Sequence, residues 1–201
     1  MNNPTLFDDF ESEIVSNETV DEINQELLTK AKALPTFANE FFIFGTGDVN
    51  AEVVVVGESP GAPDADSEKP FMGPVGRLLE KILAAIGIRR EEVYLTNVVK
   101  YISQGDELTP DILKFFIPFL HREILAINPK VIISLGNTPT KALLNTKKAI
   151  SQIRGEFYDY NGIKLMPTFN PAYLLRDPTK KREVWEDMKK VRDFLNSSSN
   201  I

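Results

Sequence analysis

A carboxylate and an aromatic ring lie around one tight glycine turn, where their types and spacing could do chemistry. Four valines at 53–56 end in the sequence GESPG at 57–61, and Phe71 follows ten residues after the last of these glycines. Proteins of the α/β class build their sites at the ends of such buried strands. A carboxylate in a glycine turn between buried elements is costly unless it is used or paired, so Glu58 is the first candidate catalytic residue.

The same turn matches the nucleophile elbow G-x-S-x-G, which would make the chain a serine hydrolase. That motif needs the backbone N–H after the serine as an oxyanion donor, and Pro60 has no N–H. The one histidine, His121, lies in a stretch with the pattern of an amphipathic helix. No G-K-[ST] follows the glycines, which excludes a Walker phosphate loop. A purely conformational role would explain the glycines but not Glu58.

Length and composition indicate one folded domain with appendages. A chain of 201 residues, 42% of them hydrophobic, can bury one good core. Because there is no cysteine, disulfides, thiolate metal sites and cysteine nucleophiles are excluded. No apolar run is long enough to cross a membrane, and the N-terminus lacks the pattern of a signal peptide, so we expect a cytoplasmic protein.

Charge is spread unevenly along the chain. The net charge is -6, but residues 1–29 hold eight acidic side chains and no lysine or arginine, so the remainder carries +2. Basic residues crowd near the C-terminus, at Arg176, Lys180, Lys181, Arg182, Lys189, Lys190 and Arg192. A surface for nucleic acid and a solvated helix face both explain this crowding.

Residues 1–17 have the composition of a flexible acidic arm, followed by a single domain at 18–201. Two interpretations of the arm stay open. The segment 5–7 (TLF) together with Phe10 could anchor a partner protein, or the arm could only be solvated. The pattern of apolar residues predicts a helix at 18–34 immediately after it.

From residue 51 onward, predicted strands alternate with predicted helices. We expect strands at 52–56, 93–97 and 131–135, each followed by a helix, at 74–86, 110–127 and 139–144. Thr109 and Thr138 each precede a proline, which predicts that their hydroxyls cap the second and third helices. This alternation predicts an α/β fold in which helices cover both faces of a parallel sheet.

The C-terminal part carries a hairpin signal. Asn161-Gly162 lies between predicted strands at 156–160 and 163–166, which favours a type I′ turn. The last strand runs into the sequence PTFNPAYLLR at 167–176. A final helix at 180–196 is expected to close the domain.

Polar residues follow three of the predicted strands. They are Glu58 together with Phe71, Asn97 after the second strand, and Asn170 after the last. Parallel strands carry their C-terminal ends to one edge, so these residues can converge on a planar heterocycle. Taken singly, each asparagine also fits a turn or helix cap, and the phenylalanine fits a core position.

Four ordered blocks of sequence then resemble the uracil-DNA glycosylase superfamily, and most closely its family 4, the iron–sulfur type. The blocks are GESPG at 57–61, KPFMGPVGRLL at 69–79, TNVVK at 96–100 and NPAYLLR at 170–176. The likeness covers roughly residues 51–195 and is far more specific than one short motif. It implies a three-layer α/β/α sandwich around a central parallel four-stranded sheet, and removal of uracil from DNA.

The resemblance also implies roles for residues around the first turn. Glu58 would orient or activate water, or stabilise the cationic sugar. Phe71 would stack on the flipped-out uracil, while Asn97 would bind the O4 and N3 edge of the base. Gly57 and Ser59 would complete the substrate site. Base flipping needs such a stacking partner and edge contacts.

Further roles fall on the last block. Asn170 would be catalytic, donating to uracil O2 as negative charge builds there. Leu174 would enter the gap left in the duplex, and Arg176 would lie close to the phosphates. The apolar pair of Leu174 and Leu175 fits such a wedge. A core-facing start to the last helix is the competing interpretation of the leucines.

The chain departs from the family in three places. Family 4 holds a four-iron cluster with four cysteines, but here Tyr101 and Phe116 stand at two of those places, and the other two are lost near 34–40. We therefore expect aromatic packing there, no metal and no cofactor. Histidine is usual where Asn170 stands. Ala65 and Glu68 replace the usual aspartate and glycine.

Two hypotheses of different classes remain. The first is a monomeric, monofunctional DNA glycosylase acting on DNA with a flipped-out uracil or another deaminated base. The second is a non-catalytic protein of the same fold that binds damaged bases or nucleotides. The absent histidine favours the second, and the presence of a carboxylate near the sugar favours the first.

Overall fold

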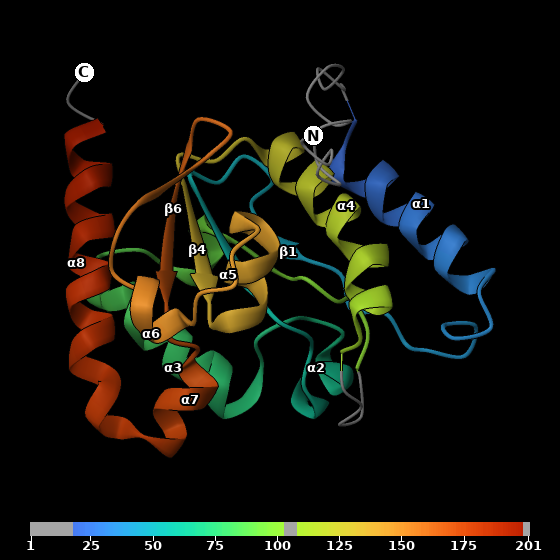
Figure 1. Cartoon of the computed structure of the whole chain (residues 1–201), viewed down its shortest axis with the longest axis horizontal. Coiled ribbons are helices and arrows are strands. Elements are labelled where there is room, and N and C mark those ends of the chain that lie inside the picture. The colour runs from blue at the N-terminus through green and yellow to red at the C-terminus, as the bar shows by residue number, and fades with distance from the viewer. Residues whose placement is uncertain (1–17, 103–107, 199–201) are drawn as a thin grey trace, which may run out of the picture.

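The protein folds around one mixed sheet, as seen in a computed structural model that describes residues 18–102 and 108–198 (Figure 1). Within these residues the sheet has six strands in the order β1-β3-β2-β4-β6-β5. The strands are β1 (Thr46–Gly47), β2 (Val53–Gly57), β3 (Tyr94–Asn97), β4 (Val131–Leu135), β5 (Tyr158–Tyr160) and β6 (Ile163–Thr168). The central strands β3, β2, β4 and β6 are parallel, which confirms the predicted four-stranded core. Strands β1 and β5 add antiparallel edges, and the sequence did not indicate β1.

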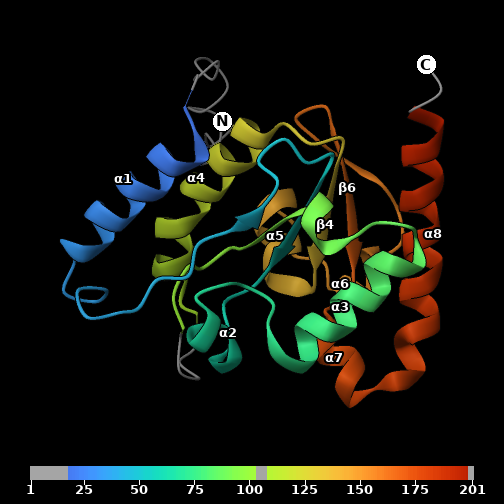
Figure 2. The same ribbon diagram turned by 180° about the vertical axis from the view of Figure 1, so that it is seen from behind.

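Helices cover both faces of this sheet. They are α1 (Val20–Lys32), α2 (Ala62–Ser67), α3 (Gly73–Ala85), η2 (Arg90–Glu92), α4 (Pro110–Ile127), α5 (Asn137–Leu144), α6 (Ile150–Ile153), α7 (Pro171–Arg176), η3 (Pro178–Lys180) and α8 (Lys181–Ser198). Buried residues of α1, α4 and α5 share one apolar core with the sheet, and those of α3, α7 and α8 share the other. Figures 1 and 2 show α1 and α4 on one side and α3 and α8 on the other. The predicted three-layer sandwich is therefore confirmed.

The four valines of β2 contribute side chains to both apolar cores. All five residues of this strand are buried. Val54 and Val56 pack with α1 and α4, whereas Val53 and Val55 pack with α3 and α8. Successive side chains of a strand point to opposite faces, so a strand covered on both faces must be apolar throughout.

Two local signals in the sequence are confirmed. Asn161 and Gly162, between β5 and β6, have φ angles of 50° and 83°, as a type I′ turn requires. The hydroxyl of Thr109 caps α4 by accepting from the N–H of Ile112 at 3.4 Å.

The acidic arm at 1–17 lies outside the described residues, so its separation from a domain at 18–201 stays a prediction. Among the helices of the described ranges, none is long and apolar enough to cross a membrane.

A buried ion pair fastens β3 to α4. The Lys100 ammonium lies 2.6 Å from a carboxylate oxygen of Glu123, and both side chains are 1% exposed. Tyr94 and Thr96 donate to the same carboxylate at 2.9 Å and 3.1 Å. Burial lowers the pKa of Lys100 and raises that of Tyr94. The network therefore anchors the strand that ends at Asn97.

His121 lies on the same helix and faces the hairpin. Its ring stacks on Tyr160 with 5.5 Å between centroids, and Nδ1 shares a hydrogen bond with the tyrosine hydroxyl. Burial lowers the pKa of this histidine from 6.5 to about 4. The imidazole is therefore neutral in the folded protein near pH 7.

We expect mild acid to destabilise the fold through His121. The unfolded chain binds one more proton than the folded chain between pH 6.5 and about pH 4. The contribution to stability is complete above pH 6.5 and is lost as the pH falls. From pH 7 to pH 5 the free energy of unfolding should drop by about 2 kcal/mol. Urea unfolding at both pH values would measure this, and an equal drop in His121→Gln would contradict the assignment.

Candidate active site

The C-terminal ends of β2 and β3 bring three predicted site residues together. Gly57 and Asn97 are partners in the parallel register of these strands. A Cβ atom on Gly57 would lie 2.4 Å from Oδ1 of Asn97 and 2.6 Å from Cζ of Phe71. The asparagine amide and the aromatic ring therefore meet over a glycine that leaves room for both.

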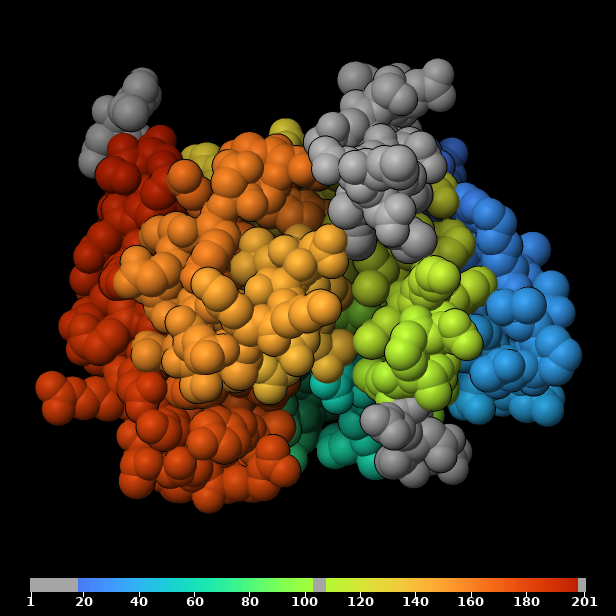
Figure 3. Space-filling model, in the orientation of Figure 1, coloured from blue at the N-terminus to red at the C-terminus, as the bar shows by residue number. Residues whose placement is uncertain are grey.

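Helix α7 and the loop between β2 and α3 form the surface beside this end of the sheet (Figure 3). In the space-filling view, atoms of α7 lie beside those of the loop between β2 and α3, and the surface is hollowed between them (Figure 3). Asn97 itself is 3% exposed. An amide in this position offers both a donor and an acceptor to a ligand.

Glu58 is exposed and is held by a residue from another strand end. Its side chain accepts a hydrogen bond from the hydroxyl of Thr138 in α5. The backbone carbonyl of Glu58 accepts from the N–H of Val99 at 2.9 Å, which fixes the turn to the segment after β3. The carboxylate therefore has a defined place at the mouth of the site.

The expected capping role of Thr138 was wrong. Helix α5 begins at Asn137, and its N-cap is Gly136, which has no side chain to contribute. The threonine lies inside the first turn, so its hydroxyl is free to reach Glu58. Sequence reasoning identified the hydroxyl but assigned it the wrong partner.

Phe71 has an unusual backbone conformation. Its φ angle is 57°, in the left-handed region that non-glycine residues rarely adopt, and the residue is 6% exposed. Arg90 donates to its carbonyl, and Asp64 accepts from the N–H of Met72. Sequence reasoning missed both of these residues, because the burial of Asp64 and the reach of Arg90 to the loop appear only in the folded chain.

Asn170 is built into the start of α7. Its Oδ1 accepts from the N–H of Ala172 at 2.8 Å, and its Nδ2 donates to the carbonyl of Leu135 at 3.4 Å. The helix-cap interpretation is therefore observed. One N–H of Nδ2 is left over, because an asparagine amide has two donors.

The two leucines of α7 have different environments. Leu174 is 1% exposed and belongs to the core that α3 and α8 share, whereas Leu175 is 45% exposed. Arg176 is exposed beside it. Leu174, which the family resemblance places in the duplex, is therefore part of the core in this structure without DNA, and its role toward DNA stays a prediction.

Ser59 directly follows Glu58 in the sequence and is half-buried. The described residues offer its hydroxyl no hydrogen bond. Its place in the substrate site stays a prediction.

An aromatic cluster occupies the region where the family resemblance implies four cysteines. Phe37 lies 5.3 Å from Tyr101 and 5.4 Å from Phe116, between ring centroids. Tyr101 and Phe116 are themselves 5.9 Å apart. The chain contains no cysteine, and the described residues contain no group of histidine, aspartate or glutamate that could hold a metal ion. These residues do not fit an iron–sulfur cluster.

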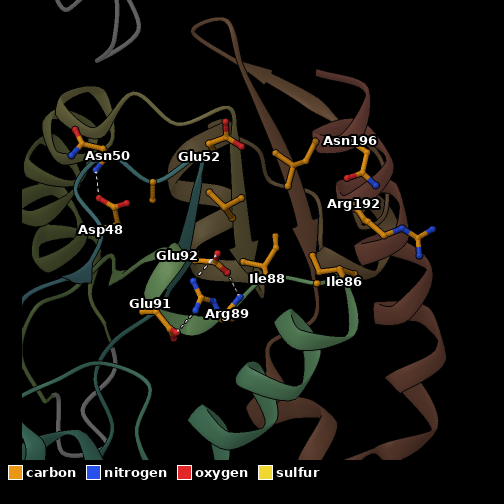
Figure 4. Close-up of a pocket in the computed structure, with 14 residues that line it drawn as sticks. Asp48, Asn50, Glu52, Ile86, Ile88, Arg89, Glu91, Glu92, Arg192 and Asn196 are labelled. Carbon is orange, nitrogen blue, oxygen red and sulfur yellow. Dashed lines mark hydrogen bonds and ion pairs between the residues drawn. The ribbon is translucent and has the colours of Figure 1, made fainter. Parts of the chain in front are cut away.

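A second hollow lies at the N-terminal ends of the strands, opposite the candidate active site (Figure 4). Its lining includes Glu52 before β2, Arg89 before η2 and Arg192 of α8. Figure 4 shows the Arg89 guanidinium bonded to Glu91 and Glu92 of its own turn. This hollow holds none of the predicted site residues.

Comparison with known proteins adds independent findings. The family model described as "Uracil DNA glycosylase superfamily" matches residues 44–189. A "Type-4 uracil-DNA glycosylase" of Thermotoga maritima is 37% identical over 186 residues, which is 90% of this chain and 97% of that protein. Proteins of the same name are 32% identical over 186 residues in Archaeoglobus fulgidus and 36% identical over 163 in Saccharolobus solfataricus. These alignments span 88% of this chain and 94% of the first protein, and 76% of both chains for the second.

Proposed function

This chain belongs to the uracil-DNA glycosylase superfamily, and from that premise we propose that it hydrolyses the N-glycosidic bond of uracil in DNA. It is an enzyme of DNA base excision repair. The observation that carries the proposal is the meeting of Phe71 and Asn97 over Gly57, with the Glu58 carboxylate on the adjoining residue. In this proposal the Phe71 ring and the Asn97 amide receive a planar base, and the Glu58 carboxylate supplies a negative charge next to it.

Phe71 and Asn97 recognise the flipped base in this proposal. The aromatic ring supplies a stacking surface, and the amide of Asn97 pairs with the O4 and N3 edge of uracil. Ser59 adds a hydroxyl beside this pair.

Glu58 acts on water and on the sugar. As the bond between N1 and C1′ breaks, uracil leaves with the electron pair and the sugar becomes cationic. The carboxylate stabilises that cation and orients the water that adds to C1′. The proton that water loses balances the proton that uracil gains, and an abasic site is left in the DNA.

Asn170 assists the departing base from α7. The remaining N–H on its Nδ2 can donate to uracil O2 as charge builds there. A neutral amide is a weaker partner for an anion than a charged group. The substrate is therefore uracil or a related deaminated base, with a rate that this asparagine limits.

The DNA backbone lies along α7 and the start of α8. The exposed Leu175 takes the wedge role, since Leu174 is buried, and Arg176 lies next to it. Lys181 and Arg182 extend the positive charge toward the phosphates.

The proposed reaction needs no cofactor. The aromatic cluster of Phe37, Tyr101 and Phe116 takes the structural place of the metal cluster that the resemblance implies. The enzyme acts as a monomer in this proposal. The acidic arm at 1–17 is assigned to docking on a partner protein or to solubility.

Base release is the direct test. Purified protein is incubated with labelled oligonucleotides that carry one uracil, opposite guanine, opposite adenine or single-stranded. Hot alkali then cleaves the DNA wherever an abasic site has formed. Cleavage at the uracil supports the proposal. Intact DNA under enzyme excess overturns the proposed hydrolysis for uracil. If the protein still binds that DNA, the non-catalytic alternative is favoured, which also agrees with the helix-capping role of Asn170.

We expect Gly57→Ala to close the base site while leaving the fold intact. The added methyl group would meet Oδ1 of Asn97 at 2.4 Å and Cζ of Phe71 at 2.6 Å. Both contacts are side-chain tips that can move aside, so the protein folds but the two recognition groups are displaced. A displacement of about 1 Å costs roughly 100-fold in rate, and we expect kcat/KM for uracil DNA to fall by about that factor.

Gly61→Ala is the matched control for this prediction. A Cβ atom there meets only Cδ of Pro63, at an ordinary contact distance of 3.6 Å, and its φ angle is -98°. This variant should keep near wild-type activity. Equal activity in the two variants would show that Gly57 does not shape the site.

A further inference from the structure

Phe71 holds its position against a conformational cost. A left-handed φ of 57° is unfavourable for a residue with a side chain and persists only where neighbouring contacts enforce it. The ring is thereby aimed at Gly57 rather than at solvent. The residues that enforce this conformation lie outside the reacting groups.

We infer that Arg90 is a positioning residue, which acts together with Asp64 to hold Phe71 ready to stack on the base. Arg90 comes from η2, nineteen residues further along the chain. Its Nη1 donates to the carbonyl of Phe71 at 2.8 Å, and its Nη2 donates to the carbonyl of Pro70 at 2.7 Å. One planar guanidinium thus fixes two successive peptide groups. The inference rests on the proposed function of the site.

Glu80 orients this guanidinium from α3. Its carboxylate lies 3.2 Å from Nη1 of Arg90, and the arginine side chain is 22% exposed. The arginine is therefore held on one side by an ion pair and on the other by the two carbonyl groups.

Asp64 holds the loop from the opposite side. Its Oδ1 accepts from the N–H of Met72 at 2.7 Å, and its Oδ2 accepts from the N–H of Gly61 at 3.0 Å. The aspartate is 6% exposed. It joins the end of the Glu58 turn to the residue after Phe71, so the carboxylate and the ring belong to one braced loop.

The first turn of α3 completes this support. A Cβ atom on Gly76 would lie 1.7 Å from the carbonyl oxygen of Phe71. Only glycine allows the helix to approach so closely. Ordering the loop before DNA binds lowers the entropic cost of binding, which is the advantage of a preorganised site.

A double-mutant cycle between Arg90→Lys and Phe71→Ala tests the inference. Lysine keeps the charge and can still pair with Glu80, but it lacks the rigid planar pair of nitrogens with which the guanidinium reaches the two carbonyl groups in fixed directions. We expect Arg90→Lys to lower kcat/KM about 10-fold in the presence of Phe71, mainly through a higher KM, because stacking binds the base in ground state and transition state alike. In the Phe71→Ala background the same change should cost less than about 2-fold.

An equal loss in both backgrounds would overturn the inference. Arg89→Lys is the matched control, because the Arg89 guanidinium pairs with Glu91 and Glu92 of its own turn and lines the hollow at the opposite ends of the strands. It should leave kcat/KM unchanged. If Arg90→Lys does not fold, Asp64→Asn replaces it in the same cycle with Phe71→Ala. A smaller loss of kcat/KM in the Phe71→Ala background supports the positioning role, and an equal loss in both backgrounds overturns it. Absence of uracil release by the wild-type protein would instead overturn the proposed function.

Discussion

Glu58→Gln should lower the rate of uracil release about 10²-fold to 10⁴-fold, the range typical of a lost general base or charge-stabilising carboxylate. The amide keeps the size of the side chain and can still accept the hydrogen bond from Thr138. Only the negative charge is removed, so the cationic sugar loses its counter-charge and the water loses its general base. Single-turnover release of uracil from a labelled oligonucleotide measures the effect, and the melting temperature should not change.

Glu52→Gln provides the control at the other end of the same strand. Glu52 is also exposed, but it forms an ion pair with Lys130 and lines the hollow at the N-terminal ends of the strands. Its substitution should leave the rate within about 2-fold of wild type, as expected for a surface charge far from the site. A Glu58→Gln protein with a rate in that same range would remove this residue from the proposed mechanism.

Lys100→Met should destabilise the protein by about 3–5 kcal/mol, because it leaves the carboxylate of Glu123 buried without its cation. That carboxylate is 1% exposed and lies 2.6 Å from the ammonium group that would be lost. Urea unfolding at pH 7 measures the loss. Replacing both partners, as Lys100→Met with Glu123→Leu, should recover most of the stability, since no charge is then left buried.

Lys130→Met tests whether burial causes the large loss of stability expected for Lys100→Met. Lys130 pairs with Glu52 at the surface, with side chains 39% and 54% exposed. Loss of such a pair should change the free energy of unfolding by less than about 1 kcal/mol. Similar losses from Lys100→Met and Lys130→Met would contradict the special cost assigned to the buried pair.

The parallel sheet and its two covered faces could be predicted because local patterns carry that information. The apolar run at 53–56, the proline-marked start of α4 and the Asn161-Gly162 turn each depend on residues close in sequence. The short strand β1 gave no such pattern, since it has two residues and depends on pairing with β3.

The convergence of Glu58, Phe71 and Asn97 could also be expected from the sequence, because parallel strands carry their C-terminal ends to one edge. The aromatic packing of Tyr101 and Phe116 with a residue in 34–40 was expected from the family blocks and is observed. Both predictions depend only on which segments come together, and on no detail of side-chain orientation.

Side-chain partners were decided by the tertiary structure alone. The Thr138 hydroxyl bonds Glu58 instead of capping α5, because the helix starts two residues earlier than its proline suggests. Leu174 and Leu175 are alike in sequence, but the rotation of α7 buries one and exposes the other. Arg90 reaches Phe71 across nineteen residues of chain. By itself the sequence determined the sheet, its layers and the edge that holds the site, since these follow from local periodicity and chain direction. Contacts between distant segments depend on register and helix rotation, which only the packed fold sets.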